Sequence, residues 1–151
     1  MRTANIYRKT SETEIDLEID LDGKGKSIVD TPVPFLNHML KLFAKHGLFD
    51  LKIEADGDIE IDAHHTVEDI GIVLGQALKK AIGDKKGIRR YGDQFTPMDE
   101  ALVQTVLDFG GRAYLNFTLD NLKDRIGNFD TELIEEFFRA VAFNAGMNIH
   151  I

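Results

Sequence analysis

The stretch FLNHMLKLFAKHGLFDLKI, residues 35–53, matches a second stretch, LIEEFFRAVAFNAGMNIHI, residues 133–151. At this shift of 98 residues (133 − 35 = 98), apolar positions fall on apolar positions, as Met39 does on Phe137. Two amphipathic helices can match in this way by period alone, but here the strand pattern after each helix also keeps phase. We therefore predict an internal duplication whose unit contains a helix followed by a strand.

Strand patterns fill most of the chain outside the predicted helices. In ETEIDLEIDL, residues 12–21, apolar side chains alternate with acids, as in a strand with one solvated face, and the DGKGK turn that follows would open a β-hairpin. Further strands are predicted in three segments: a strand, a turn and a strand over residues 49–62, three strands over 89–120 that are broken by Gly92, Pro97 and the Gly110–Gly111 pair, and one strand over 147–151.

Three segments have the 3.6-residue period of helices, namely residues 35–47, 65–83 and 131–146. Gly47 and Gly83 would end the first two, and the second has acids in its first turn and lysines in its last. The apolar face of the first helix would consist of Phe35, Met39, Leu42 and Phe43. This order of elements predicts an α+β fold, and the sequence has no glycine-rich nucleotide-binding loop.

The composition limits the class of protein. The 151 residues, 43% of them hydrophobic, can build the core of one domain or of two small fused halves. With 18 Lys and Arg against 26 Asp and Glu, the formal net charge of −8 argues against a nucleic-acid partner. No signal peptide or long apolar span occurs, which favours a cytoplasmic location without a membrane partner. Since cysteine is absent, imidazole and carboxylate are the groups that would bind a metal.

The segment DAHHTVEDIG, residues 62–71, places two of the five histidines side by side at the start of the second predicted helix. Glu68 follows His64 by four residues, so these two share a helix face, while His65 is turned away by about 100°. Histidines that diverge in this way suit two metal ions flanking one helix. The alternative is a solvated helix N-terminus at which Glu68 and Asp69 interact favourably with the helix dipole.

His38 is a further candidate metal ligand. It lies beside Met39 and Leu42 on the first predicted helix, where an imidazole without a partner would be costly. A core histidine with a satisfied hydrogen bond is the alternative. Because the chain has few histidines, the presence of histidine on two separate helices favours the metal-ligand interpretation.

Together, these segments resemble those of the imidazoleglycerol-phosphate dehydratase family of histidine biosynthesis. The matching segments follow one another in family order over essentially the whole chain: RKTSETEI, FLNHML, HGLFDL, GDIEIDAHHTVEDIGIVLGQAL, RRYGDQFTPMDEAL, DFGGRAYL and FDTELIEEFFRAVAFNAGMNIHI. The resemblance implies an internally duplicated, two-layer α/β sandwich unit of the ribosomal protein S5 domain 2-like kind, with helices backing a sheet in each half. We expect residues 1–90 to form the first half and residues 91–151 the second.

The resemblance also implies a metal cofactor and an assembly. Family members use two manganese ions, and their trimers build an octahedral homo-oligomeric shell with active sites between subunits. Carried over to this chain, one Mn²⁺ would be held by His38 and His65, and the other by His64, Glu68 and Glu136. Many relatives have histidine at the position of Glu136, but a carboxylate also suits Mn²⁺.

The implied reaction is the dehydration of imidazole glycerol phosphate to imidazole acetol phosphate by a manganese-dependent hydro-lyase, in which the metals act as Lewis acids. Glu12 matches the family's acid/base residue for the carbon-bound proton, although by itself it resembles a solvent-facing strand residue. Arg90 and Arg112 match phosphate-contacting positions, and His46 matches a substrate-contacting one; by themselves they resemble ordinary polar surface residues. The residues expected to contact substrate are Glu12, His38, His46, His64, His65, Glu68, Arg90 and Arg112.

The family also has a second HHxxE motif, which the shift of 98 would begin at residue 162 (64 + 98 = 162), whereas the sequence given ends at Ile151. We therefore expect a shortened chain in which each metal lacks some ligands, and we expect a polypeptide of these residues to be inactive. The alternative is a non-catalytic metal-binding or assembly relative of the enzyme.

Overall fold

The computed structural model describes residues 1–119 and 122–151, and this part of the chain forms two four-stranded sheets, a short hairpin and three helices. The N-terminal elements are β1 (Thr3–Lys9), β2 (Thr13–Asp20), β3 (Ser27–Asp30), α1 (Pro34–Gly47), β4 (Asp50–Gly57) and α2 (His64–Ile82). The C-terminal elements are β5 (Tyr91–Met98), β6 (Ala101–Asp108), β7 (Tyr114–Asn116), β8 (Arg125–Ile126), β9 (Phe129–Asp130), α3 (Glu132–Ala145) and β10 (Asn148–His150).

The two large sheets repeat one arrangement. Their strand orders are β1-β2-β4-β3 and β5-β6-β10-β7; in each sheet the last two strands of this order run parallel, and the other pairs are antiparallel. Helix α1 shifted by 98 residues has the bounds of α3 (34 + 98 = 132 and 47 + 98 = 145). The predicted α+β class and its duplicated unit are therefore confirmed, whereas the division between residues 90 and 91 stays a prediction.

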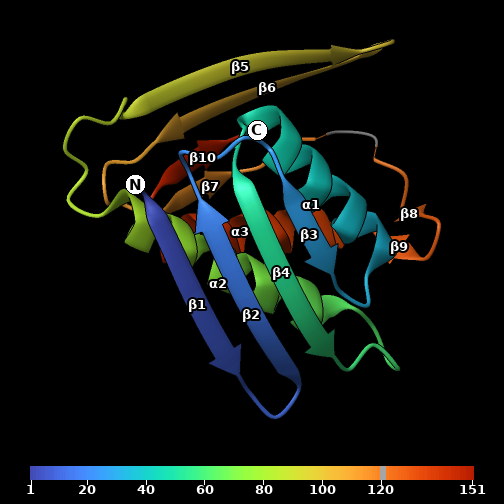
Figure 1. Ribbon diagram of the computed structural model, residues 1–151. Coiled ribbons are helices and arrows are strands. Elements are labelled where there is room, and N and C mark those ends of the chain that lie inside the picture. The colour runs from blue at the N-terminus through green and yellow to red at the C-terminus, as the bar shows by residue number, and fades with distance from the viewer. Residues whose placement is uncertain (120–121) are drawn as a thin grey trace.

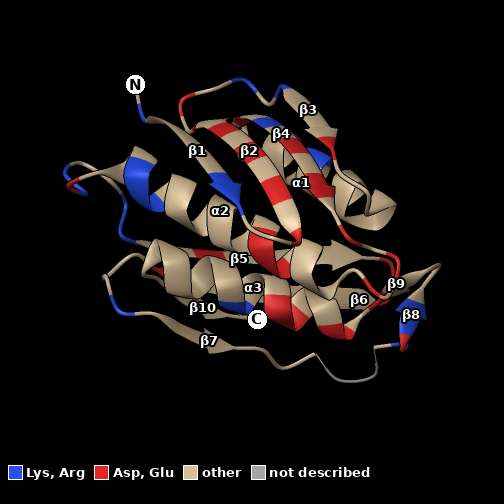
Figure 2. Ribbon diagram, turned by 90° about the horizontal axis from the view of Figure 1, so that it is seen from below, with Lys and Arg blue, Asp and Glu red and all other residues tan. Residues whose placement is uncertain are grey.

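The helices α2 and α3 lie between the two sheets (Figures 1 and 2). α2 packs against β1 and β2, α1 packs against β3 and β4, and α3 packs against β7 and β10. The alternation in β2 explains why α2 covers this sheet, since Ile15, Leu17 and Ile19 all point inward and are buried. On the helix side, Val67 and Ile70 of α2 are fully buried in the same core. No helix of the described ranges is both long and apolar enough to cross a membrane.

Two glycines of α2 bring α3 close to it. A Cβ atom added to Gly71 would lie 2.8 Å from the carbonyl oxygen of Phe137, and one added to Gly75 would lie 2.7 Å from that of Val141. These distances are too short for a carbon atom beside a backbone oxygen, so a side chain at either position would push the helices apart. The close pair α2 and α3 therefore connects the two sheets through the middle of the molecule.

The first sheet differs from the prediction in two places. β2 forms its hairpin with β1, whereas DGKGK leads into β3, which pairs in parallel with β4. Residues 58–62 form no strand, because both edges of β4 are already paired, with β2 on one side and β3 on the other. The three strands predicted over 89–120 are present as β5, β6 and β7, although Asp120 lies outside the described residues.

The prediction that Gly92 and Pro97 break the strands was wrong. Both lie inside β5, and proline is tolerated there because β5 is an edge strand with one unpaired side. The break comes instead at Asp99, which adopts a φ of 51° in the turn between β5 and β6.

The predicted apolar face of α1 was wrong by one position. Its buried residues are Leu36, Leu40 and Ala44, while Met39 and Phe43 are exposed. The helix has apolar residues on more than one side, so its period alone did not identify the stripe that faces the sheet. Its C-cap also differs from the prediction, since the left-handed conformation belongs to the residue after Gly47, Leu48, with a φ of 57°.

Candidate functional site

The paired histidines occupy the first two positions of α2. The carboxylate of Asp62 accepts a hydrogen bond from the backbone N–H of His64 at 2.8 Å, and so satisfies one of the free amide groups of the first turn. The side chains of His64, His65 and Glu68 are 43%, 55% and 42% exposed. Their nitrogen and oxygen atoms are therefore open to a ligand at the start of the helix.

The two imidazoles point in different directions and meet different acids. Nε2 of His64 lies 3.7 Å from Oε2 of Glu68, four residues later on the same helix. Nδ1 of His65 lies 3.3 Å from Oε2 of Glu12, which comes from the turn between β1 and β2. The ring centroids are 6.0 Å apart, with an interplanar angle of 79°. The start of α2 thus carries two separate pairs of an imidazole and a carboxylate.

The turn that carries Glu12 is held by its own threonines. The hydroxyl oxygen of Thr10 accepts hydrogen bonds from the backbone N–H groups of Glu12 at 3.2 Å and of Thr13 at 3.0 Å. In addition, the backbone N–H of Thr10 donates to the carbonyl of Thr13 at 2.8 Å, and the carbonyl of Glu12 accepts from the N–H of Asp58 at 3.1 Å. The backbone of Glu12 is therefore fixed, although its side chain is half exposed.

The sequence pattern offered Asp69 only as an acid at a solvated helix N-terminus, whereas the structure buries it in this site region. It is 8% exposed, and its Oδ2 accepts a hydrogen bond from the hydroxyl of Thr13 at 2.5 Å and lies 2.5 Å from Nη1 of Arg8. The available signal was the charge of two inward positions: Arg8 falls on the inward face of β1, and Asp69 falls on the buried face of α2. A buried acid and a half-buried base at facing positions can be partners for each other.

His38, His46 and Glu136 lie elsewhere in this chain. His38 and His46 are exposed on α1, and Glu136 is half-buried on α3. The expectation that His38 sits in an apolar environment was wrong, because its side of α1 faces away from the sheet. In the described part of the chain, no three His, Asp or Glu side chains come together as a metal-binding group. The predicted ligand sets therefore remain predictions, and within one copy of the described chain the predicted ligands lie in separate places.

Arg90 forms an ion pair with Asp108, at the end of β6, and Arg112 contributes positive charge near the same carboxylate. Nε of Arg90 donates to Asp108 at 2.6 Å and Nη2 donates at 3.1 Å, and the guanidinium lies over the ring of Tyr91, 4.9 Å from its centroid. The hydrogen bonds from Arg90 hold the pKa of Asp108 below its ordinary value, and the positive charge of Arg112 adds to the effect. A phosphate that bound here would share these arginines with Asp108.

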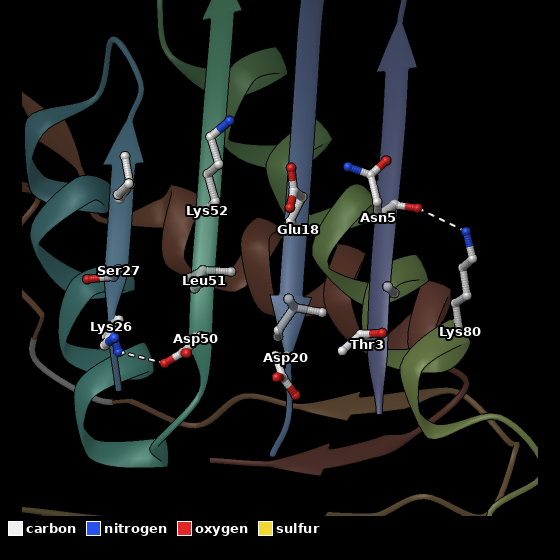
Figure 3. Close-up of a pocket in the computed structure, with 13 residues that line it drawn as sticks. Thr3, Asn5, Glu18, Asp20, Lys26, Ser27, Asp50, Leu51, Lys52 and Lys80 are labelled. Carbon is white, nitrogen blue, oxygen red and sulfur yellow. Dashed lines mark hydrogen bonds between the residues drawn. The ribbon is translucent and has the colours of Figure 1, made fainter. Parts of the chain in front are cut away.

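A hollow on the outer face of the first sheet lies apart from all of these residues (Figure 3). In it, the backbone N–H of Lys26 donates to Asp50 at 2.9 Å and the ammonium of Lys80 donates to the carbonyl of Asn5 at 3.0 Å. Asp and Glu gather along the neighbouring parts of β2 and β4 (Figure 2), and in the hollow itself three acids offset the three lysines, so it holds no excess of positive charge for a phosphate. None of the predicted site residues is among those described as lining the hollow, which makes the start of α2 the better candidate.

Known proteins with the same sequence pattern identify the family. The family model described as imidazoleglycerol-phosphate dehydratase matches residues 31–151. The chain belongs to this family. The imidazoleglycerol-phosphate dehydratase of Acetivibrio thermocellus is 62% identical over 150 residues, which are 99% of this chain and 77% of that protein. The enzyme of the same name from Geobacter sulfurreducens is 59% identical over 150 residues, again 99% and 77% of the two chains.

Solved structures of imidazoleglycerol-phosphate dehydratases have the same fold. The crystal structure from Staphylococcus aureus matches with a TM-score of 0.87 and 46% identity, and covers 98% of this chain and 81% of that one. The structure from Pyrococcus furiosus matches with a TM-score of 0.83 and 36% identity, over 96% and 77% of the two chains. The family's members are hydro-lyases of histidine biosynthesis, as the resemblance in the sequence predicted.

The donor groups at the start of α2 fit the kind of metal that the imidazoleglycerol-phosphate dehydratase resemblance implies. Imidazole nitrogen and carboxylate oxygen suit Mn²⁺, and the side chains of His64, His65 and Glu68 present both at an accessible surface. Both imidazoles are about half exposed, and their contacts with carboxylates are 3.7 and 3.3 Å long, so neither is withheld from a ligand.

Proposed function

We propose that this chain forms the part of an imidazoleglycerol-phosphate dehydratase that binds Mn²⁺ and imidazole glycerol phosphate at the start of α2. The 3.3 Å contact between His65 and Glu12 carries the proposal, because it sets an acid/base residue directly beside a predicted metal ligand. The product would be imidazole acetol phosphate, formed by loss of one water molecule from the glycerol part of the substrate.

The chain's own ligands for the metal would be His64, His65 and Glu68 from α2, with His38 from α1 and Glu136 from α3. When bound, Mn²⁺ would supply Lewis acidity and a fixed template for the substrate's imidazole ring. Since the described residues do not gather into a group of three, we infer that each complete site combines residues from more than one copy of the chain. This supports the homo-oligomer, built from trimers, that the family resemblance implies.

Glu12 would move the proton that is bound to carbon. Dehydration requires that this proton leave and that the neighbouring hydroxyl depart with a proton as water, so one acid/base group must take up a proton at the carbon side. The fixed backbone of the turn and the exposed carboxylate of Glu12 suit this task, because the carboxylate can reach a bound molecule without a change of the fold.

The phosphate group would bind to Arg90 and Arg112. A guanidinium offers planar pairs of N–H donors that match phosphate oxygens, and Asp108 already orients the Arg90 guanidinium by two hydrogen bonds. His46 lies in the last turn of α1. It would contact a substrate that is bound either at the site of its own copy of the chain or at that of a neighbouring copy. Neither nucleic acid nor membrane is expected as a partner, and we expect the enzyme to act in the cytoplasm.

A second candidate function is metal binding or assembly without catalysis. The observation that favours it is that the predicted metal ligands do not come together as a group of three in the described part of the chain. Under the first proposal, a polypeptide that consists of residues 1–151 alone has fewer metal ligands than the family enzyme, so we expect it to show little or no turnover.

Dehydratase assays can separate the two candidates. The natural protein is purified, stripped of metal with a chelator and assayed with imidazole glycerol phosphate before and after Mn²⁺ is restored. The first proposal expects turnover that is lost and then regained, whereas binding of Mn²⁺ without any turnover would favour the second. A polypeptide of residues 1–151, confirmed by mass, is assayed beside it for activity and for particle size.

A further inference from the structure

The turn that carries Glu12 is attached to α2 at two neighbouring points. His65 and Asp69 are four residues apart on α2 and therefore lie on one helix face. His65 contacts Glu12 at 3.3 Å, and Asp69 accepts the hydroxyl hydrogen bond of Thr13 at 2.5 Å. Glu12 in the turn and Thr13 at the start of β2 thus meet two residues that are one helical turn apart.

A single carboxylate oxygen holds both arms of the hairpin. Oδ2 of Asp69 contacts Arg8 on β1 and Thr13 on β2, and these two residues lie on either side of the turn. The side chain of Asp69 is only 12% exposed and that of Arg8 is 29% exposed, so the pair is screened from water. A buried ion pair of this kind adds little to stability when compared with apolar residues, and its main effect is to fix geometry.

Glu12 depends on this attachment for its position. Its carboxylate is half exposed, and its one ion pair among the described residues is the contact with His65. The place of that carboxylate is therefore set by the backbone of the turn, and the turn is set by Thr10 within it and by Asp69 beneath it. A shift of about 1 Å in a catalytic group can cost about a hundredfold in rate.

We propose that Asp69, together with Thr13 and Arg8, is a positioning group that holds Glu12 at its distance from His65. This inference rests on the proposed function, since it takes Glu12 as the acid/base residue. Asp69 does not touch the substrate in this proposal, and it acts through the hydroxyl of Thr13 on the residue before it.

The first test replaces the hydroxyl and keeps the shape of the side chain. In the natural holoenzyme with Mn²⁺, we expect Thr13→Val to lower kcat about tenfold to a hundredfold, while KM and the metal content stay within about threefold of the original. Thr13→Ser restores a hydroxyl at the same position and should recover most of kcat. If Thr13→Val turns over like the original enzyme, the positioning role is wrong.

Glu14→Gln is the matched control. Glu14 lies next to Thr13 on β2, but it faces the other side of the sheet, where it accepts hydrogen bonds from Tyr7 and Lys9 at 2.6 Å each. Its substitution disturbs the same hairpin without touching α2, and kcat should remain near the original value. An equal loss of kcat in Glu14→Gln and Thr13→Val would mean that any weakening of the hairpin has this effect, and would overturn the proposal.

Amide hydrogen exchange tests the attachment without any assay of activity. The N–H groups of Thr10 and Thr13 are both hydrogen-bonded inside the turn. In Thr13→Val, and in Asp69→Asn as a second variant, we expect the amides at positions 10 and 13 to exchange at least about fivefold faster, with the amide of Leu17 in the core of β2 unchanged. Unchanged exchange in the turn would overturn the proposal, and so would an equal increase at Leu17, which indicates a loss of overall stability.

The kinetic and hydrogen-exchange measurements distinguish a failure of the proposed function from a failure of the positioning role. If the original holoenzyme shows no dehydratase activity, the proposed function is wrong, and hydrogen exchange alone decides whether Asp69 holds the turn. If the original enzyme is active and the exchange changes as expected but kcat does not, the attachment is real and its role in positioning Glu12 is wrong.

Discussion

Nδ1 of His65 lies 3.3 Å from Oε2 of Glu12, so the start of α2 and the turn between β1 and β2 form one site. The two residues were identified in different ways, His65 from the spacing of HHxxE on a helix and Glu12 only from the family resemblance. Under the proposed function, their contact brings a metal ligand and an acid/base residue within 3.3 Å of each other, which is the arrangement that a metal-assisted dehydration needs.

Glu12→Gln should lower turnover by orders of magnitude in the natural holoenzyme. The amide keeps the size of the side chain and removes its ability to carry a proton, so Mn²⁺ content and substrate affinity should stay close to the original. Steady-state kinetics with elemental analysis check both parts. Glu54→Gln, on the exposed face of β4, is the control and should be fully active. Near-normal turnover of Glu12→Gln would return Glu12 to the role of a solvated residue.

The two histidines should affect different metal ions. Because the ring planes of His64 and His65 are inclined by 79° and the two imidazoles pair with different acids, we expect His65→Ala to remove one Mn²⁺ per subunit and His64→Ala to weaken the other. Inductively coupled plasma measurements on the purified natural protein give the count. His150→Ala, in β10 against the ring of Tyr114, is the control and should keep both ions. Unchanged metal in both α2 variants would exclude the two-metal assignment.

Local sequence patterns predicted most of the helices and strands, but only some of the contacts at the candidate site. Alternation around Leu17 and the 3.6-residue period of α2 determined these elements, because burial of one face is a local property. The buried face of α1 and the partner of β3 depended on which sheet edge was free, and a local pattern holds no information on that. The contacts of Asp69 with Arg8 and Thr13 cross 61 and 56 residues of sequence (69 − 8 = 61 and 69 − 13 = 56), so they became visible only in the folded chain.

Asp50 should make the fold sensitive to acid. Its carboxylate accepts hydrogen bonds from the backbone N–H groups of Lys24 at 2.8 Å and of Lys26 at 2.9 Å, the second of which Figure 3 shows. These bonds, Lys24 first, hold the pKa of Asp50 below its ordinary value. A carboxyl whose pKa is lowered by folding stabilises the fold above its unfolded-state pKa of about 3.9, and this contribution is lost as the pH falls through the folded value.

Urea unfolding at two pH values tests this contribution. At pH 7, Asp50→Asn should be less stable than the original, and the difference should shrink as the pH falls through the lowered folded-state pKa of Asp50, because the original carboxyl then loses its charge as well. Asp56→Asn is the control, since Asp56 is exposed at the other end of β4. A difference between Asp50→Asn and the original that is equally large at both pH values would show that the amide, and not the charge, causes the loss.

Gly75→Ala should destabilise the pairing of α2 with α3. Alanine favours a helix over glycine by about 1 kcal/mol, so in an open helix this change would stabilise the protein. Here the added Cβ would lie 2.7 Å from the carbonyl oxygen of Val141 and 2.8 Å from Cβ of Asn144, and overpacking costs typically about 1–3 kcal/mol. Because the nearest atom belongs to the backbone and cannot rotate away, the helices themselves must move, and we expect a net loss of about 1–2 kcal/mol in the free energy of unfolding.

Gly92→Ala in β5 is the control, since nothing lies within 4 Å of its added Cβ, and it should be neutral or slightly stabilising. Urea unfolding of the two variants gives the comparison, and a Gly75→Ala protein as stable as Gly92→Ala would show that α2 and α3 do not depend on this close approach.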